Sequence, residues 1–88
     1  MEHYVYIIES EMDGTFYKGY SLNPLKRLEA HNEGETEFSA MKIPWKLVFL
    51  QSYASKKEAL IRERALKKYS RSQIEQLLLS TKNELNKE

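Results

Sequence analysis

The sequence predicts an α+β fold in which a small three-stranded antiparallel sheet is flanked by helices, in the order ββαβαα. Two observations lead to this prediction. Three short segments are rich in β-branched and aromatic residues, which is typical of strands, and a hairpin signal separates the first two. Ser and Asn residues stand between and after them where they can cap helices. We therefore expect one layer of strands with helices packed on it.

The expected strands follow from composition and from one turn. They are Tyr4–Ser10, Thr15–Tyr20 and Trp45–Tyr53. Asp13-Gly14 is a strong signal for a hairpin between the first two. A two-residue turn pairs Ile8 with Gly19, and a four-residue turn keeps the same side chains on the same face. With either turn, one face of the sheet is shared by Tyr6, Ile8, Tyr17 and Gly19.

Gly19 has two explanations. It carries no side chain, so it would leave a bare patch beside the tyrosines that the backbone of a ligand could approach closely. The alternative is that the tyrosines are half-buried packing residues and that Gly19 marks a bulge. For two tyrosines considered alone, packing is the better explanation.

Capping residues locate the first two helices. Asn23 can cap a helix that has a proline at its first position and that reaches about Asn32. Ser55 starts a second helix, because Glu58 stands three residues later and completes a capping box. This second helix is expected to reach about Tyr69.

The first helix presents two different faces. Leu25 and Leu28 are expected to form its buried side, whereas Arg27 and His31 lie four residues apart on another face. Arg suits bidentate contact with phosphate, and His can donate to a phosphate or accept a proton near neutral pH. The alternative, favoured for this pair taken alone, is a solvated Arg and a surface His at the helix end.

Glu63 gives the clearest signal on the second helix. It follows Ala59 by four residues and precedes Leu66 by three, so helical spacing places it among apolar neighbours. A carboxylate on an inward face needs a partner, a proton or a metal. The alternative to a functional role is an ion pair with Lys67, one turn later, and the sequence favours the two interpretations about equally.

The rest of the chain completes a single expected domain over residues 1–80. Residues 33–44 are expected to form a loop. A third helix starts at Ser70 or Ser72, and its apolar stripe comprises Ile74, Leu77 and Leu78. Residues 81–88 are expected to be a frayed C-terminal tail.

Composition excludes some classes of function. The chain has no cysteine among its 88 residues, so disulfides, thiolate metal sites and cysteine nucleophiles are absent. We see no signal-like start and no long apolar run, and we expect a cytoplasmic protein with no membrane contact. The net charge is only +1, but residues 56–71 carry seven Lys/Arg against two Asp/Glu. Such a stretch can follow phosphates, although on charge alone a solvated helix face explains it better.

Together these residues resemble the GIY-YIG nuclease superfamily. The two triplets that name it are matched by Tyr4-Val5-Tyr6, with Tyr4 in place of Gly, and by Tyr17-Lys18-Gly19, with Lys18 in place of Ile. The helical Arg, the frequent His one turn later and the metal-binding Glu of the family match Arg27, His31 and Glu63. The resemblance runs from Tyr4 to about Arg71. The sequence is similar to small stand-alone members related to the amino-terminal nuclease domain of the excision-repair endonuclease.

The resemblance implies a metal-dependent endonuclease that acts on DNA in repair or recombination, selecting structure rather than sequence. Glu63 would hold one Mg²⁺ or Mn²⁺ ion, and Arg27 would stabilise the phosphate in the transition state. Tyr17 would activate or orient the attacking water while Tyr6 holds it. His31 is the candidate basic partner of Tyr17, and which of these two finally takes the proton stays open. Nucleic acid would be contacted by Lys18, Gly19, Arg27, Lys56, Lys67 and Lys68.

Two other functions fit the same residues. The first is a nucleic-acid-binding module that keeps the fold without useful turnover, because Glu33, Glu35 and Glu37 suit a DNA surface poorly. The second is a scaffold protein, which would leave five matching polar residues without a role. The sequence does not distinguish DNA from RNA, and it does not give an oligomeric state.

Overall fold

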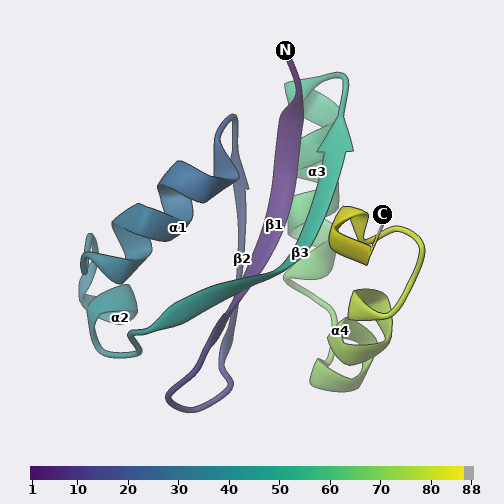
Figure 1. Cartoon of the computed structure of the whole chain (residues 1–88). Coiled ribbons are helices and arrows are strands. Elements are labelled where there is room, and N and C mark those ends of the chain that lie inside the picture. Colours follow the sequence, from purple (N-terminus) through teal and green to yellow (C-terminus); the bar gives the residue numbers. More distant parts are fainter. Residues whose placement is uncertain (87–88) are drawn as a thin grey trace.

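The structure is a computed structural model that describes residues 1–86 (Figure 1). It has the predicted α+β fold and the predicted order of the main elements. Its elements in chain order are β1 (His3–Ser10), β2 (Phe16–Ser21), α1 (Pro24–Asn32), α2 (Glu37–Ala40), β3 (Trp45–Tyr53), α3 (Lys56–Leu66), α4 (Arg71–Leu78) and a 3₁₀ helix, η1 (Glu84–Asn86).

The sheet has the order β2-β1-β3, and both strand pairs are antiparallel. The hairpin turn has four residues, since Ser10 N donates to Thr15 O at 2.9 Å across it. Tyr6 therefore lies opposite Gly19, and a pairing based on a two-residue turn is wrong by two positions. The longer turn is stabilised from within, because the Ser10 hydroxyl accepts from two turn amides and Asp13 Oδ1 accepts from Thr15 N. The predicted face assignment is unchanged.

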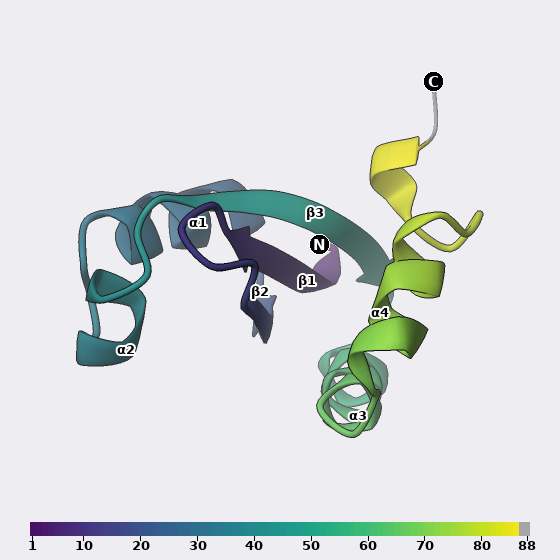
Figure 2. The ribbon, with the colours of Figure 1, turned by 90° about the horizontal axis from the view of Figure 1, so that it is seen from below.

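The two faces of the sheet bury two separate apolar clusters, because neighbouring side chains along a strand alternate between faces. One cluster includes Val5, Ile7 and Phe49, and α3 and α4 pack against it. The other is built on Tyr6, Ile8 and Trp45. Figure 2 shows α1 and α2 on one side of the sheet and α3 and α4 on the other.

The helices differ from the prediction in three details. Leu25 is 67% exposed, whereas Pro24 and His31 are the buried residues of α1, because the stripe facing the sheet runs through positions seven apart. The expected loop contains α2, which is held by a capping box between Thr36 and Ser39. Helix α3 stops at Leu66, three residues before the predicted end.

The segment 81–86 packs against the sheet, so the prediction that it frays is wrong. Asn83 is buried, accepts a hydrogen bond from Leu50 N and donates to Val48 O at 2.8 Å. Glu84 accepts hydrogen bonds from both the backbone and the hydroxyl of Ser52. These side chains satisfy the outer edge of β3, which no fourth strand from residues 1–86 covers. The expected fraying of residues 87 and 88 lies outside the described residues.

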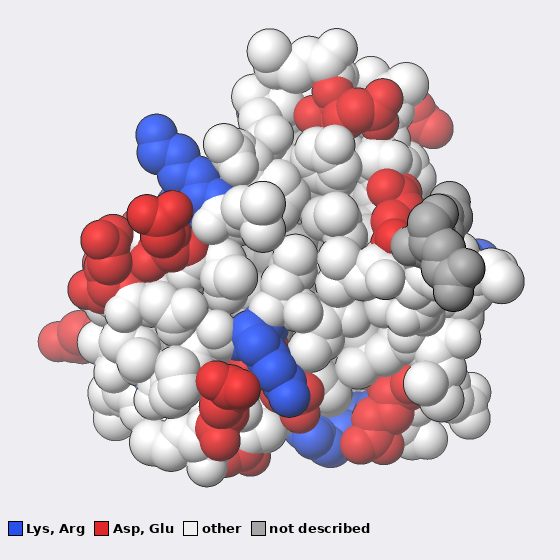
Figure 3. All heavy atoms as spheres, in the orientation of Figure 1, with Lys and Arg blue, Asp and Glu red and all other residues white. Residues whose placement is uncertain are grey.

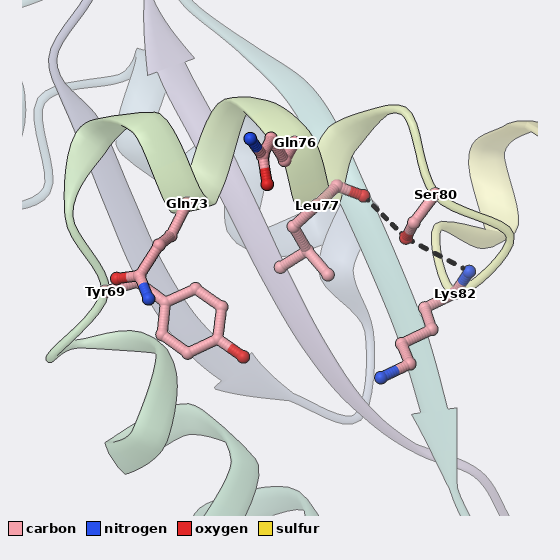
Figure 4. Close-up of a pocket in the computed structure, with 6 residues that line it drawn as sticks. All are labelled: Tyr69, Gln73, Gln76, Leu77, Ser80 and Lys82. Carbon is pink, nitrogen blue, oxygen red and sulfur yellow. Dashed lines mark hydrogen bonds between the residues drawn. The ribbon is translucent and has the colours of Figure 1, made fainter.

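A surface hollow of about 380 Å³ is lined by residues of α4 and of the turns on either side of it, as Figure 4 shows. The lining residues include Tyr69 and Leu77, and the Ser80 hydroxyl donates to Leu77 O. None of the candidate site residues lines this hollow. In residues 1–86, no helix combines the length and the apolar character needed to cross a membrane.

Candidate active site

Tyr6 lies in the middle of β1, and its ring covers Gly19 on the neighbouring strand. A Cβ atom added to Gly19 would lie 2.5 Å from Cζ and from the hydroxyl oxygen of Tyr6. Glycine is therefore needed at position 19 to admit the Tyr6 ring. The bare patch considered as one explanation of Gly19 does not exist, because the residue is buried beneath this ring. Gly19 positions a tyrosine and presents no open backbone to a ligand.

His31 is buried and meets Tyr6 rather than Tyr17. Its Nε2 atom and the Tyr6 hydroxyl are 3.2 Å apart, and the ring is 1% exposed. Burial lowers the pKa of His31 below its usual value of 6.5, and the nearby Arg27 charge lowers it further. The imidazole is therefore neutral at pH 7. Within the described chain, Nδ1 of His31 has no hydrogen-bond partner.

Tyr17 contacts His31 by its ring alone. The two ring centroids are 4.7 Å apart, and the Tyr17 and Tyr6 centroids are 6.5 Å apart. The expectation that His31 is the direct basic partner of Tyr17 is therefore not met. The hydrogen bond goes to Tyr6 because Tyr6 lies on the central strand, across from the end of α1. Tyr17 lies on the edge strand and is half-buried.

The Tyr6 phenol is protonated at neutral pH. Burial raises its pKa above the ordinary value of 10, while the guanidinium of Arg27 beside it lowers the pKa by less. Coulombic interactions with Tyr17 and Glu63 also raise the pKa of Tyr6. A protonated phenol can donate to the neutral His31 Nε2 and still present its oxygen lone pairs to Arg27.

Arg27 reaches the site from α1 and is already paired. Its Nη1 atom lies 2.9 Å from Oε1 and 3.3 Å from Oε2 of Glu35, which stands just before α2. The side chains of both residues are more than one-third exposed, so the pair is open to solvent. Figure 3 shows that acidic side chains gather over α1 on this face of the molecule. A phosphate that binds Arg27 must therefore displace the Glu35 carboxylate or share the guanidinium with it.

Glu63 lies on α3, in the layer on the opposite side of the sheet from α1. It stands between the buried residues Ala59 and Leu66, and only 16% of its side chain is exposed. Lys67 Nζ lies 3.6 Å from its Oε2, so the ion pair considered from the sequence is present. Lys67 itself is 56% exposed. The charge of Glu63 is one of the causes that raise the pKa of Tyr6.

The expected nucleic-acid contacts divide between two surfaces. Lys18 alternates with Tyr17 along β2, so it lies on the α3 side of the sheet. Lys56 places its ammonium 5.8 Å from the centre of the Tyr20 ring on that same side. Lys67 and Lys68 follow the end of α3 and are exposed. Arg27 stands apart from these lysines, on the tyrosine side.

Comparison with known proteins identifies the family. The sequence profile described as the GIY-YIG catalytic domain matches residues 2–77, most of the chain. This protein belongs to the GIY-YIG family. The resemblance noted from Tyr6, Tyr17, Arg27, His31 and Glu63 is thereby confirmed at the level of the family. Membership implies a nuclease, and hence a nucleic-acid substrate.

Related GIY-YIG proteins are also small. A UPF0213 protein of Streptococcus pneumoniae serotype 4 is 38% identical over 81 residues, covering 89% of this chain and 81% of the relative. A UPF0213 protein of Halobacterium salinarum is 40% identical over 76 residues, covering 85% and 97%. The solution NMR structure of a UPF0213 protein from Bacillus halodurans is similar, with a TM-score of 0.60 and 34% identity, over 97% of this chain and 90% of that one.

The residues present fit a magnesium ion held largely by water and substrate. In the described part of the chain, no three His, Asp or Glu side chains are grouped so that they could hold a metal by themselves. Mg²⁺ does not need such a cage, since it keeps several waters and binds through one or two carboxylates and the phosphates of its substrate. Only 16% of the Glu63 side chain is exposed, and its present partner is an exposed lysine that can move away. It suits the single-carboxylate role.

Two neighbours of this GIY-YIG site were missed from the sequence, and both lie in the expected loop. Glu35 pairs with Arg27, and Phe38 on α2 lies beside Tyr17 with 6.1 Å between the ring centroids. The spacing of Thr36 and Ser39 is a short capping signal that indicates α2. No local signal shows that the loop folds back over α1, because that depends on tertiary contacts.

Proposed function

We propose that this protein is a metal-dependent endonuclease that hydrolyses phosphodiester bonds in DNA, selected by structure rather than by sequence, in repair or recombination. The observation that supports it best is the buried Tyr6–His31 hydrogen bond with Arg27 beside the same phenol. Packing alone does not explain a buried imidazole whose Nδ1 has no partner in residues 1–86. A site that moves protons next to a phosphate explains it.

Glu63 would hold the divalent ion, Mg²⁺ or Mn²⁺. When bound, such an ion polarises a phosphate oxygen and neutralises charge on the leaving group. To accept the ion, the Glu63 carboxylate must release Lys67, which is exposed and has a flexible stem. That exchange needs no change in the backbone of α3.

Arg27 would bind the phosphate whose bond is cleaved. A guanidinium can offer two parallel N–H donors to phosphate oxygens, and its interaction grows as negative charge accumulates in the transition state. In the free protein Glu35 already occupies Nη1. Substrate binding therefore replaces one anionic partner of Arg27 by another.

The two tyrosines would have different tasks. Tyr17 would orient the attacking water from the edge strand. Tyr6 would accept a proton from that water while giving its own proton to His31 Nε2, along the existing 3.2 Å hydrogen bond. The neutral state of His31 keeps its acceptor free for this transfer. One proton leaves the water and one reaches the imidazole, so the relay balances.

A nucleic-acid-binding module without turnover is the second candidate. It is supported by the observation that both key charges are neutralised within the chain, Arg27 by Glu35 and Glu63 by Lys67. The two candidates separate in one assay. Purified protein is incubated with labelled duplex, flapped, branched and single-stranded DNA in Mg²⁺, Mn²⁺ or EDTA. Metal-dependent products support the endonuclease, and binding without products under every condition supports the module.

A further inference from the structure

We infer that Phe38 is a stacking platform for an unpaired nucleobase next to the phosphate at Arg27, so that the preferred substrate is single-stranded or frayed at the cleaved bond. This inference rests on the proposed function. It adds the class of substrate and a residue that selects it.

Phe38 is an exposed aromatic ring at the border of the site. It is 45% exposed, although its centroid lies 6.1 Å from that of Tyr17 and 6.0 Å from that of Trp45. Tyr17 in turn contacts His31. The chain thus places rings continuously from the buried proton relay to the surface, and the last ring keeps one side open. Bases stack readily on such rings, because each base has a π face.

Helix α2, which carries the ring, is held in place by a network of hydrogen bonds. Thr36 and Ser39 close a capping box around the first turn of α2. The Trp45 indole donates to Ser39 O at 3.0 Å, and the Trp45 backbone exchanges two hydrogen bonds with the Asn32 side chain. Helix α2 is therefore tied both to β3 and to the end of α1. A platform fixed before binding loses little conformational entropy when a base stacks on it.

The charges around Phe38 favour a base over a phosphate backbone. Glu33, Glu35 and Glu37 are exposed on the same segment and repel phosphates. Lys42 places its Nζ 5.9 Å from the centre of the ring, and this ammonium is already paired, 2.6 Å from Asp13 Oδ2. A duplex lying across α2 would bring its charged backbone onto these carboxylates. A single strand can turn its phosphates toward Arg27 and offer Phe38 an uncharged base.

The test measures binding of two DNA ligands in EDTA, which prevents metal-dependent cleavage. One is a single-stranded oligonucleotide with one 2-aminopurine, whose fluorescence falls on stacking, and the other is the matching duplex. Phe38→Leu keeps an apolar side chain against Trp45 but removes the π face, whereas Phe38→Trp keeps a π face. We expect Phe38→Leu to weaken single-strand binding roughly 5- to 100-fold and to abolish the fluorescence quenching. Phe38→Trp should retain both, and duplex binding should not change.

Three results would overturn the inference. Equal binding of single strand and duplex by the wild type would remove the substrate preference. Unchanged single-strand affinity and quenching in a folded Phe38→Leu protein would remove the platform. A loss in Phe38→Trp equal to that in Phe38→Leu would show that the ring serves only packing. In each case metal-dependent cleavage by the wild type decides separately whether the proposed endonuclease function stands.

Discussion

At the scale of the residue, the site depends on one missing side chain. Tyr6 can lie flat across β2 only because position 19 has no Cβ, and that placement brings its hydroxyl to His31 and Arg27. The pattern of Tyr and Gly in the family name therefore has a steric reason in this chain. The glycine admits the tyrosine, and the tyrosine connects the buried His31 to Arg27.

Tyr17→Phe tests the chemical role of the second tyrosine. We expect cleavage to fall about 10²-fold with DNA affinity nearly unchanged, because the hydroxyl orients the attacking water for the transition state and a misplaced reactant costs that much in rate. Single-turnover rates and equilibrium binding separate the two effects. Tyr4→Phe is the matched control. Tyr4 lies on the same face of the sheet as Tyr6 and Tyr17, but it lines a different hollow with Leu22 and Leu25. Full turnover by Tyr17→Phe would make Tyr17 a packing residue.

Glu35→Gln tests whether the ion pair of Arg27 competes with substrate. Removing the carboxylate frees the guanidinium, so single-stranded and duplex DNA should both bind a few-fold more tightly. Glu33→Gln changes the net charge equally, and Glu33 is not the residue paired with Arg27. Fluorescence anisotropy at fixed salt compares the two. An equal gain in both variants would show a general charge effect, and weaker binding in Glu35→Gln would show that Glu35 positions Arg27.

At the scale of the element, the sequence predicted what is local. Strand β3, the cap of α1 by Asn23 and the start of α4 at Ser70 all follow from short-range patterns, and each is present. The pairing register stayed open between two turn lengths, and the exposure of Leu25 was mispredicted, because they depend on turn length and on which face of α1 meets the sheet. The common face of Tyr6 and Tyr17 followed from strand parity, which the longer turn preserves.

The partners of the site residues could not be predicted in this way. Nothing near Tyr6 in sequence indicates that the Nε2 of a residue 25 positions away will lie against its hydroxyl. The Glu35–Arg27 pair likewise requires the chain after α1 to fold back. Both contacts are products of packing, and spacing along the chain does not encode them.

The C-terminal segment is a structural element of the sheet, which Asn83→Ala tests. The side chain bonds the backbone of β3 and Leu78 O from a buried position, so its removal leaves buried backbone groups unpaired. We expect the free energy of unfolding to fall by about 1–3 kcal/mol in denaturant titrations. Lys82→Ala, at an exposed neighbouring position, should change it by less than about 0.5 kcal/mol. Equal, small effects would mean that the segment is dispensable.

At the scale of the whole molecule, His31 couples stability to pH. The pKa of His31 is lower in the folded state than in the unfolded chain. Below about pH 6.5 the unfolded chain therefore binds a proton at His31 that the folded chain does not bind, and this favours unfolding. The melting temperature should therefore fall as the pH is lowered from 7.5 to 5.5. The fall should be smaller in His31→Gln, as calorimetry can measure. An identical fall in wild type and His31→Gln would contradict a buried, neutral His31.

The two sides of the sheet must act together if this molecule is a nuclease. Tyr6, Tyr17 and Arg27 lie on the α1 side and Glu63 on the α3 side, and the edge strand β2 runs between them. A substrate that engages both sets would lie along that edge. The basic lysines of α3 and the turn after it would then add affinity that depends on salt.

The most direct test of this account is the rate of single-stranded DNA cleavage by Glu63→Gln in excess Mg²⁺, beside wild type and Glu75→Gln. Because Lys67 is 56% exposed, losing its partner strands no buried cation, and the variant should fold with a melting temperature close to that of wild type. We predict metal-dependent cleavage by wild type and by Glu75→Gln and no cleavage by folded Glu63→Gln. Wild-type cleavage by Glu63→Gln, or undiminished cleavage by wild type in EDTA, would contradict it.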